Sequence, residues 1–272
     1  MKTEFYDSNQ VHRSLLDEIH SLVKYRYLIG ELILRNIKTR YKRSLLGVAW
    51  TMVNPLLTML VMTFVFSQLF AFDIPRYPVY LLTGLLLWNF FSETTVSATR
   101  NLIWSSKLLK RIYIPKSLFA TAAVGTGLVN LLIALIPLGI IILITGTQVG
   151  LALFFLPIAL LLISLFSFGV GLAISAQAVF FADVVDMYQI ILVAWMYLTP
   201  IFYPLNILPD KFQWIIFFNP MYYILECFRS PLYLNKVPEP QIILGAVISA
   251  SVALLLGGFL FARKSDDFAY YL

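Results

Sequence analysis

One stretch of the chain, residues 44–72, contains no charged residue. About 20 apolar residues in a row are enough for a helix to cross the hydrocarbon core of a bilayer. The whole chain of 272 residues is 60% hydrophobic and 12% charged, whereas a soluble domain normally carries charge on about a quarter of its residues. Polar side chains are therefore too few to cover a water-soluble globule. The fold class predicted is an all-α polytopic membrane protein.

Six transmembrane helices are predicted from the apolar runs, at about residues 45–70, 79–98, 118–144, 151–181, 184–202 and 241–262. Lys and Arg concentrate on the cytoplasmic side of membrane proteins. With a cytoplasmic N-terminus, 16 of these residues fall inside and four fall outside, and the even number of crossings puts both termini in the cytoplasm. The expected domains are a cytoplasmic N-terminal segment (1–44), a transmembrane domain (45–262) and a cytoplasmic tail (263–272).

The segment before the first crossing is basic and partly amphipathic. A helix there has apolar side chains on one side, at Ile29, Leu32, Ile33 and Ile37. Its charged side chains lie opposite, at Glu31, Arg35, Lys38 and Lys42. Asn36 and Arg40 interrupt the apolar side. Such a helix is typical of the membrane interface, where its cations meet anionic head groups. The alternative is an ordinary surface helix of a soluble domain.

The outer segment 203–240 is apolar but contains six prolines, and neither half is long enough to cross a membrane. Prolines remove backbone donors, and irregular backbone at membrane depth needs protein or a wet cavity around it. We therefore expect outer re-entrant or interfacial helices in this segment. If it is helical, Glu226 and Arg229 stand at i, i+3 and can pair. We expect this pair to act in an outer gate; a purely structural plug is the alternative.

A cytoplasmic loop at residues 100–117 mixes cations with apolar side chains, and its centre is Lys107, Leu108, Leu109, Lys110, Arg111, Ile112 and Tyr113. This composition suits another interfacial anchor. It equally suits a short docking helix, whose apolar side chains enter a partner's groove and whose cations face an acidic rim.

Small residues recur at helical spacing in two crossings. They are Gly245, Ser249, Ala253 and Gly257 in the sixth and Ser164, Ser167, Gly171 and Ser175 in the fourth. Such residues let membrane helices approach closely, so we expect them to serve packing. Glu93 differs, because an ionisable group at membrane depth is a functional candidate. It shares a helix face with Asn89, Ser97 and Arg100. The alternatives are that Glu93 reaches the inner head groups or pairs with Arg100.

Aromatic residues make up 15% of the chain. Trp and Tyr often form belts at membrane interfaces, which is the expectation for Trp104 and Trp214. Four other rings lie beside polar residues: Trp50, Trp88, Trp195 and Tyr197. With Asn54, Asn89 and Glu93, they are predicted to line a path along the first, second and fifth crossings. Rings with a few hydrogen-bonding neighbours suit the C–H faces and hydroxyls of a sugar chain. Conduction requires such contacts to be weak and multiple.

The sequence gives little support for a catalytic site or a metal site. Both histidines, His12 and His20, lie in the N-terminal segment, and the acidic pair Asp266 and Asp267 has no neighbouring ligands. The single cysteine, Cys227, excludes an intrachain disulfide and a cysteine metal cluster. No GxxxxGK[ST] loop is present to bind ATP phosphates. The net charge of +6 is explained by topology, so no nucleic acid is expected as a partner.

Several ordered pieces of the chain carry a family resemblance: RNIKTRYKRSLLGVAWTMVNPLL, YLLTGLLLWNFF, LLKRIYIPKS, LTPIFYPLNILP and FFNPMYYILECFR. Together they resemble the membrane-spanning subunit of ABC-2 type exporters, in the branch that exports O-antigen, teichoic acid and capsular polysaccharide. Their order and spacing hold from about residue 25 to residue 261. One departure is Ala182, because the family is expected to have Arg before Asp183. The ion pair of that Arg is therefore in doubt.

The resemblance implies a homodimer in the inner membrane, paired with two copies of a separate ATP-hydrolysing subunit that binds ATP and Mg. This chain would be a transport subunit with no cofactor of its own. The substrate would be a lipid-linked polysaccharide moved outward. The loop Trp104–Pro115 would dock on the ATPase, and the helix carrying Arg35 and Lys38 would form a second contact. Alternatives are an ABC-2 exporter of a drug or small lipid, and a membrane enzyme of lipid-linked sugar assembly.

Overall fold

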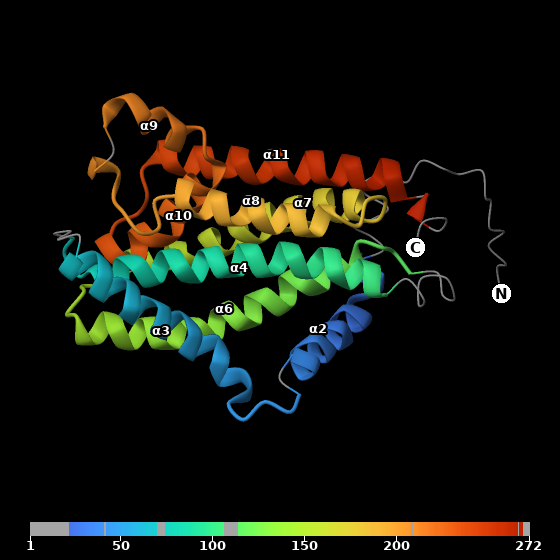
Figure 1. Ribbon diagram of the computed structural model, residues 1–272, viewed down its shortest axis with the longest axis horizontal. Helices are drawn as coiled ribbons and strands as arrows, with labels where there is room; N and C mark the ends of the chain where they lie inside the picture. The colour runs from blue at the N-terminus through green and yellow to red at the C-terminus, as the bar shows by residue number, and fades with distance from the viewer. Residues whose placement is uncertain are drawn as a thin grey trace.

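The computed structural model describes residues 22–40, 42–69, 74–105, 114–207, 209–265 and 267–268, and most of these residues are helical. The α-helices are α2 (Arg26–Arg40), α3 (Trp50–Phe64), α4 (Tyr77–Trp104), α6 (Leu118–Ile144), α7 (Leu156–Ala178), α8 (Val184–Leu198), α9 (Asp210–Phe217), α10 (Pro220–Arg229) and α11 (Pro240–Ser265). Short helical turns lie at Gly47–Ala49, Val65–Leu69, Leu151–Phe155, Leu205–Ile207 and Ser230–Leu234. The long helices lie side by side, with α2 and α3 running obliquely along one edge (Figure 1).

Four helical stretches are long and apolar enough to cross a membrane: Gly47–Ser67, Leu118–Ile144, Leu151–Ala178 and Pro240–Ser265. The chain is thus a multi-pass membrane protein, and α6 has the bounds predicted for the third crossing. The helix α4 has 28 residues, or about 42 Å at 1.5 Å per residue, but it is less apolar. The shorter apolar helix α8 has 15 residues. That α4 and α8 also cross, giving six, stays a prediction.

Local sequence explains where several helices begin and end. Pro78 and Pro220 occupy the first turns of α4 and α10, where the missing N–H costs no hydrogen bond. The side-chain oxygen of Asn219 caps α10 by accepting a hydrogen bond from the backbone N–H of Met221 at 3.0 Å. Gly146 follows the end of α6 with a φ of +63°, the left-handed conformation that glycine adopts without strain.

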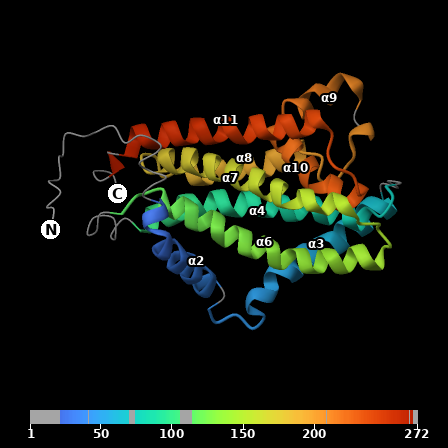
Figure 2. The same ribbon diagram turned by 180° about the vertical axis from the view of Figure 1, so that it is seen from behind.

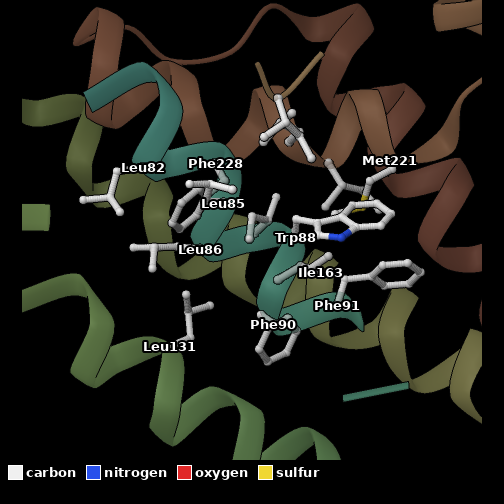
Figure 3. Close-up of a cluster of buried hydrophobic side chains, with 14 of the residues drawn as sticks. Leu82, Leu85, Leu86, Trp88, Phe90, Phe91, Leu131, Ile163, Met221 and Phe228 are labelled. Atoms are coloured by element: carbon white, nitrogen blue, oxygen red, sulfur yellow. The ribbon is translucent and has the colours of Figure 1, made fainter. Parts of the chain in front are cut away.

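The core of the bundle surrounds α4, although α4 is not among the most apolar helices. It packs against α6 and α7 along its length and also touches α3, α8 and α10. Leu81, Leu82, Leu87 and Phe91 on this helix are fully buried. Figure 3 shows the surrounding cluster, in which side chains of α4 meet Leu131 of α6, Ile163 of α7 and Phe228 of α10. Elements on every side of α4 therefore hold it in place.

Small residues serve packing, as predicted, and they do so at more than one interface. The helices α7 and α11 meet where a Cβ on Gly257 would lie 1.9 Å from the carbonyl oxygen of Gly169. Gly245 of the same stripe lies against the Tyr223 ring of α10. The stripe of α7 faces α4 instead, since the Ser175 hydroxyl donates to Thr99 Oγ1 at 3.3 Å. Gly169, the residue through which α7 contacts α11, lies outside that stripe.

The helices alternate in direction. The end of α4, the start of α6, the α7–α8 turn and the end of α11 lie together at one end of the bundle (Figures 1 and 2). The start of α4, the α6–α7 connection, α9 and α10 lie at the other end. The predicted outer segment 203–240 forms two helices of eight and ten residues, each too short to cross. The helix α10 packs against α4, α7 and α11. Its re-entrance into a membrane stays a prediction.

Candidate functional site

A cavity of about 280 Å³ lies between α2, α3, α4 and α6. Of the seven residues predicted to line a path, four line this cavity: Trp50, Asn54, Asn89 and Glu93. They form two pairs, one on α3 and one on α4, each with a spacing of four residues. Residues at that spacing lie on the same face of a helix. These four predicted residues therefore give the cavity one aromatic ring, two side-chain amides and a carboxylate.

The wall contributed by α6 lies very close to α4. A Cβ on Gly127 would meet Thr94 Oγ1 at 2.3 Å and the Phe90 ring at 3.0 Å, so only glycine permits this approach. Asn130, one turn further along α6, also lines the cavity. Its side-chain oxygen is buried and accepts no hydrogen bond from any residue that the structure describes. A buried acceptor without a partner is costly, so this oxygen is an unsatisfied polar atom in the wall of the cavity. Asn130 was not among the residues predicted from the sequence to line a path.

An ion pair closes the side of the cavity that faces α2. The two guanidinium nitrogens of Arg40 donate to the two carboxylate oxygens of Glu93, at 2.6 Å from Nη1 to Oε2 and 2.9 Å from Nη2 to Oε1. Such bidentate pairs are the stronger and more specific form of salt bridge. The two side chains are 43% and 45% exposed. Arg40, rather than Arg100, is thus the partner of Glu93.

The apolar side of α2 packs against α6, and the location of this helix at a membrane interface stays a prediction. Leu32 is buried, and Ile33 lies over Gly125. Asn36, which interrupts the apolar side, donates from Nδ2 to Thr126 Oγ1 at 3.4 Å. The two polar interruptions of that side, Asn36 and Arg40, are therefore its polar contacts with the bundle. Arg35 and Lys38 lie on the opposite, exposed side.

The other predicted path residues lie away from the cavity. Trp88 is 4% exposed and lies in the core beside Phe91 (Figure 3). Its ring centroid lies 5.6 Å from that of Phe91 and 6.2 Å from that of Trp195. Trp195 donates from Nε1 to the Asn219 side-chain oxygen at 2.8 Å. Tyr197 is exposed and stacks on Phe202. In this conformation Trp88 and Trp195 support the fold rather than the cavity wall.

The predicted pair at the outer end is formed, with 3.1 Å between Arg229 Nη1 and Glu226 Oε1. Arg229 is 2% exposed and makes further contacts. Nη1 donates to the Pro200 carbonyl at 2.9 Å, and the guanidinium carbon lies 3.8 Å from the centroid of the Tyr80 ring. Gly84 leaves room for this group, because a Cβ there would lie 2.8 Å from Nη2. Arg229 thus joins α10 to α4. Its role in a gate stays a prediction.

Tyrosine hydroxyls at the same end of the bundle donate to backbone carbonyls of the proline-rich connections. Tyr77 donates to Phe202 O at 2.8 Å, and Tyr80 donates to Tyr203 O at 2.8 Å. Tyr233 donates to Pro75 O at 2.6 Å. Burial raises the pKa of the Tyr203 phenol above its ordinary value, which already keeps a phenol protonated at neutral pH. These donors were not predicted from the sequence. The pattern that could have indicated them is the recurrence of tyrosine near proline.

The candidate coupling loop is only partly described. Residues 107–113, which include all of its predicted contact residues, lie outside the described residues. On either side of the undescribed segment 106–113, Ser105 and Ile114 are buried. At the same end of the bundle, Ala182 and Asp183 are exposed at the start of α8. Nothing in the described residues replaces the Arg expected at position 182.

Comparisons with known proteins bear on this architecture. The family model described as ABC-2 type transporter matches residues 27–233. The O-antigen export system permease protein RfbA of Myxococcus xanthus is 27% identical over 259 residues, which cover 92% of this chain and 97% of that protein. RfbA of Klebsiella pneumoniae is 27% identical, with 88% and 92% covered. The capsule polysaccharide export inner-membrane protein CtrC of Neisseria meningitidis serogroup A is 27% identical, with 91% and 94% covered.

Proposed function

Because the chain belongs to the ABC-2 type transporter family, we propose that it is the membrane-spanning subunit of an ATP-driven exporter of a lipid-linked, O-antigen-like polysaccharide. Its relatives are permease subunits for export of O-antigen and capsular polysaccharide, and they match nearly end to end. The polymer would move from the cytoplasm to the outer side of the inner membrane. The assembly would hold two copies of this chain and two ATP-hydrolysing subunits, which bind ATP and Mg.

The observation that carries the proposal is the composition of the cavity. The Trp50 ring can stack on the C–H face of a sugar ring, as aromatic side chains do with flat apolar surfaces. Asn54, Asn89 and Asn130 supply amide donors and acceptors for sugar hydroxyls. Charge is limited to Arg40 and Glu93, which neutralise one another. A neutral, partly aromatic, amide-lined cavity suits a polyhydroxylated chain better than it suits a purely apolar lipid.

The proposal also implies how the bundle is oriented in the membrane and where the ATPase subunit docks. The end of the bundle with the 106–113 segment would face the cytoplasm, because most Lys and Arg residues lie in segments assigned to that side. The ATPase would dock on this segment, on residues 107–113. The exposed side of α2, with Arg35 and Lys38, would form the second contact. The N-terminal segment 1–44 and the tail 263–272 would then be cytoplasmic, and the domain 45–262 would be embedded in the membrane.

Two experiments test the function. A tagged chain purified from its own cells should bring an ATP-hydrolysing subunit with it. Cells lacking the chain should accumulate finished lipid-linked polysaccharide on the cytoplasmic side. Failure to make the polymer at all would favour a membrane enzyme of lipid-linked sugar assembly. An unchanged polysaccharide, together with loss of drug or lipid efflux, would favour the other exporter class.

The cavity is tested by replacing its ring. Trp50→Ala should lower polysaccharide export at least fivefold while dimerisation and basal ATPase activity persist, because stacking is lost without disturbing the core. Phe64→Ala is the matched control, since Phe64 is an exposed aromatic residue on the same helix and does not line the cavity. Equal export by both variants would contradict a role for the cavity.

A further inference from the structure

The lining of the cavity changes from polar to apolar along the axis of the bundle. From the end where α4 ends and α6 begins, the residues that line it on α4 are Glu93, Asn89, Phe90 and Leu86. In the same direction, those on α6 are Gly127, Asn130, Leu131 and Ala134. The two series lie side by side, because a Cβ on Gly127 would meet the Phe90 ring at 3.0 Å. Polarity therefore falls along both walls, over about 10 Å of helix at 1.5 Å per residue.

The polar end of the cavity is open and the apolar end is closed. At the polar end, the side chains of Arg40 and Glu93 are 43% and 45% exposed, and Trp50 is 47% exposed. We call these three residues the mouth. The residues at the apolar end, which we call the floor, are buried, and they are Pro55, Leu86, Leu131 and Ala134. A charged, aromatic mouth above an apolar floor suits an amphipathic ligand.

The size of the cavity limits what this ligand is. A volume of about 280 Å³ lies just below the range of about 300–1,000 Å³ for pockets that hold drug-sized ligands. Only a short piece of a polymer therefore enters at one time. A piece made of sugars alone would bring hydroxyls against the floor, where they are costly to bury without hydrogen-bond partners. The better fit is a piece in which a hydrocarbon chain joins a polar group.

The polarity of the cavity has the direction of a lipid in the cytoplasmic leaflet. Leu131 is the central residue of α6 (Leu118–Ile144), so the floor lies near the middle of this helix. The mouth lies toward the end of the bundle that the proposed orientation places in the cytoplasm. A lipid of the cytoplasmic leaflet likewise has its head group toward the cytoplasm and its chain toward the middle of the bilayer. Arg40 and Trp50 belong to α2 and α3, which run along one edge of the bundle (Figure 1).

We propose that the cavity binds the lipid-linked end of the exported polymer, with hydrocarbon on the floor and the adjoining polar group at the mouth. This inference rests on the proposed function, which supplies the substrate and the orientation, and it assigns one part of that substrate to the cavity. Trp50 then stacks on the sugar nearest the lipid. Asn89 lies at the boundary between the two parts. The cavity thereby holds a polar group at a depth where lipid offers it no hydrogen-bond partner.

The test uses the full chain in nanodiscs of dioleoylphosphatidylcholine and two photoactivatable forms of decyl glucoside. One form carries a diazirine on the decyl chain and the other carries it on the glucose ring, and mass spectrometry identifies the residues that each one labels. The chain-labelled probe should mark Leu86 or Leu131, and the ring-labelled probe should mark Trp50 or Glu93. The reverse pattern overturns the proposal, as does labelling spread evenly over the exposed side of α11.

Competition distinguishes the possible sources of an amphipathic ligand. Unlabelled decyl glucoside should displace both probes. Glucose, decanol and dioleoylphosphatidylglycerol at the same concentration should displace them at least fivefold less. Equal displacement by glucose or by decanol would show that the site reads only one part of the ligand, and equal displacement by the phospholipid would assign the site to ordinary membrane lipid. Each of these results overturns the proposal.

Two variants connect the site to transport. Ala134→Leu fills the floor and should lower labelling by the chain-labelled probe at least fivefold, with polysaccharide export falling in parallel. Ala194→Leu adds the same atoms at an exposed position of α8 and should match the wild type. Asn89→Leu covers the case in which Ala134→Leu does not insert; it keeps a similar size, removes the amide and should weaken labelling by the ring-labelled probe. Wild-type labelling in either variant that inserts overturns the proposal.

Failure of the site and failure of the proposed function give different results. If cells lacking the chain retain the polymer inside but no probe labels the cavity, the function stands and the inference about the cavity is wrong. If cells lacking the chain export polysaccharide normally, the proposed function is wrong. The assignment of the ligand then fails with it, whatever the probes label.

Discussion

The ion pair between Arg40 and Glu93 should contribute measurably to the docking of α2. Neutralising either partner, in Arg40→Gln or Glu93→Gln, breaks the charged, bidentate contact at 2.6 and 2.9 Å. Because the side chains are 43% and 45% exposed, water screens much of the attraction, and exposed pairs are worth about 0.2–1 kcal/mol. The bidentate geometry places this pair at the upper end of that range. We therefore expect a coupling energy of about 1 kcal/mol, or about fivefold in an equilibrium constant.

A double-mutant cycle measures this energy. The unfolding free energies of the wild type, both single variants and the double variant would be compared in detergent micelles, with tryptophan fluorescence as the signal. The double variant should be destabilised by about 1 kcal/mol less than the sum of the single variants. The exchange Arg40→Glu with Glu93→Arg should recover part of the loss, and Arg100→Gln is the control on the same helix. Single effects that add to within about 0.3 kcal/mol would refute the pair as a stabilising contact.

Three further predictions concern topology, coupling and the outer end. Cysteines placed near Arg76, Gln148 and Lys236 should be labelled from outside sealed cells, and labelling near Lys107 or Lys264 would contradict the orientation. Replacing Leu108, Leu109 and Ile112 by Asp should uncouple ATP hydrolysis from export while the protein still inserts. Unchanged ATPase stimulation and export would show that this loop is not the docking site. Arg229→Gln should lower export and stability by more than Glu226→Gln, because only Arg229 also contacts Tyr80 and Pro200. For the same reason, charge reversal at both positions should not restore export, and full restoration would show that the ion pair alone matters.

The positions of the long helices could be predicted because a bilayer excludes charge. The uncharged run 118–144 coincides with α6, and the run 241–262 lies within α11 (Pro240–Ser265). The second crossing was predicted to be 20 residues long, whereas α4 extends over Tyr77–Trp104. Its last two turns contain the polar run Thr99, Arg100 and Asn101, but they remain helical because α6 and α7 cover them; Ala98 and Leu102 there are buried. Tertiary packing, rather than hydropathy, decides such ends.

The candidate site was predicted in part, and helix geometry explains which part. Trp50 and Asn54 are four residues apart, so they share a face and both reach the cavity. Trp88 and Asn89 are adjacent, and successive residues on a helix point about 100° apart. Asn89 therefore faces the cavity while Trp88 faces the core. The partner of Glu93 could not be found from local spacing, since Arg40 lies 53 residues earlier in the chain.

The end of the bundle that contains α10 shows why polar contacts, rather than apolar ones, determine the position of this helix. Lipid tails are as apolar as Leu or Phe, so burying such side chains gives little preference for protein over lipid. Direction-dependent contacts do give that preference. Arg229 of α10 donates to the Pro200 carbonyl, and its cap Asn219 donates to Thr199 Oγ1. The Tyr80 hydroxyl of α4 donates to the same Pro200 carbonyl, so α4 and α10 are joined through one connection.

Arg229 is incompletely satisfied in this arrangement. Its Nε and Nη2 donate to no acceptor among the described residues, and the face of the Tyr80 ring compensates only in part. Moving the guanidinium away from Gly84 would therefore break one ion pair, one hydrogen bond to a carbonyl and one ring contact. It would also allow two buried N–H donors to find new acceptors. Such partial compensation lowers the net cost of moving α10 relative to a fully satisfied network. This balance suits the outer gate predicted for α10, which has to be held closed and still move.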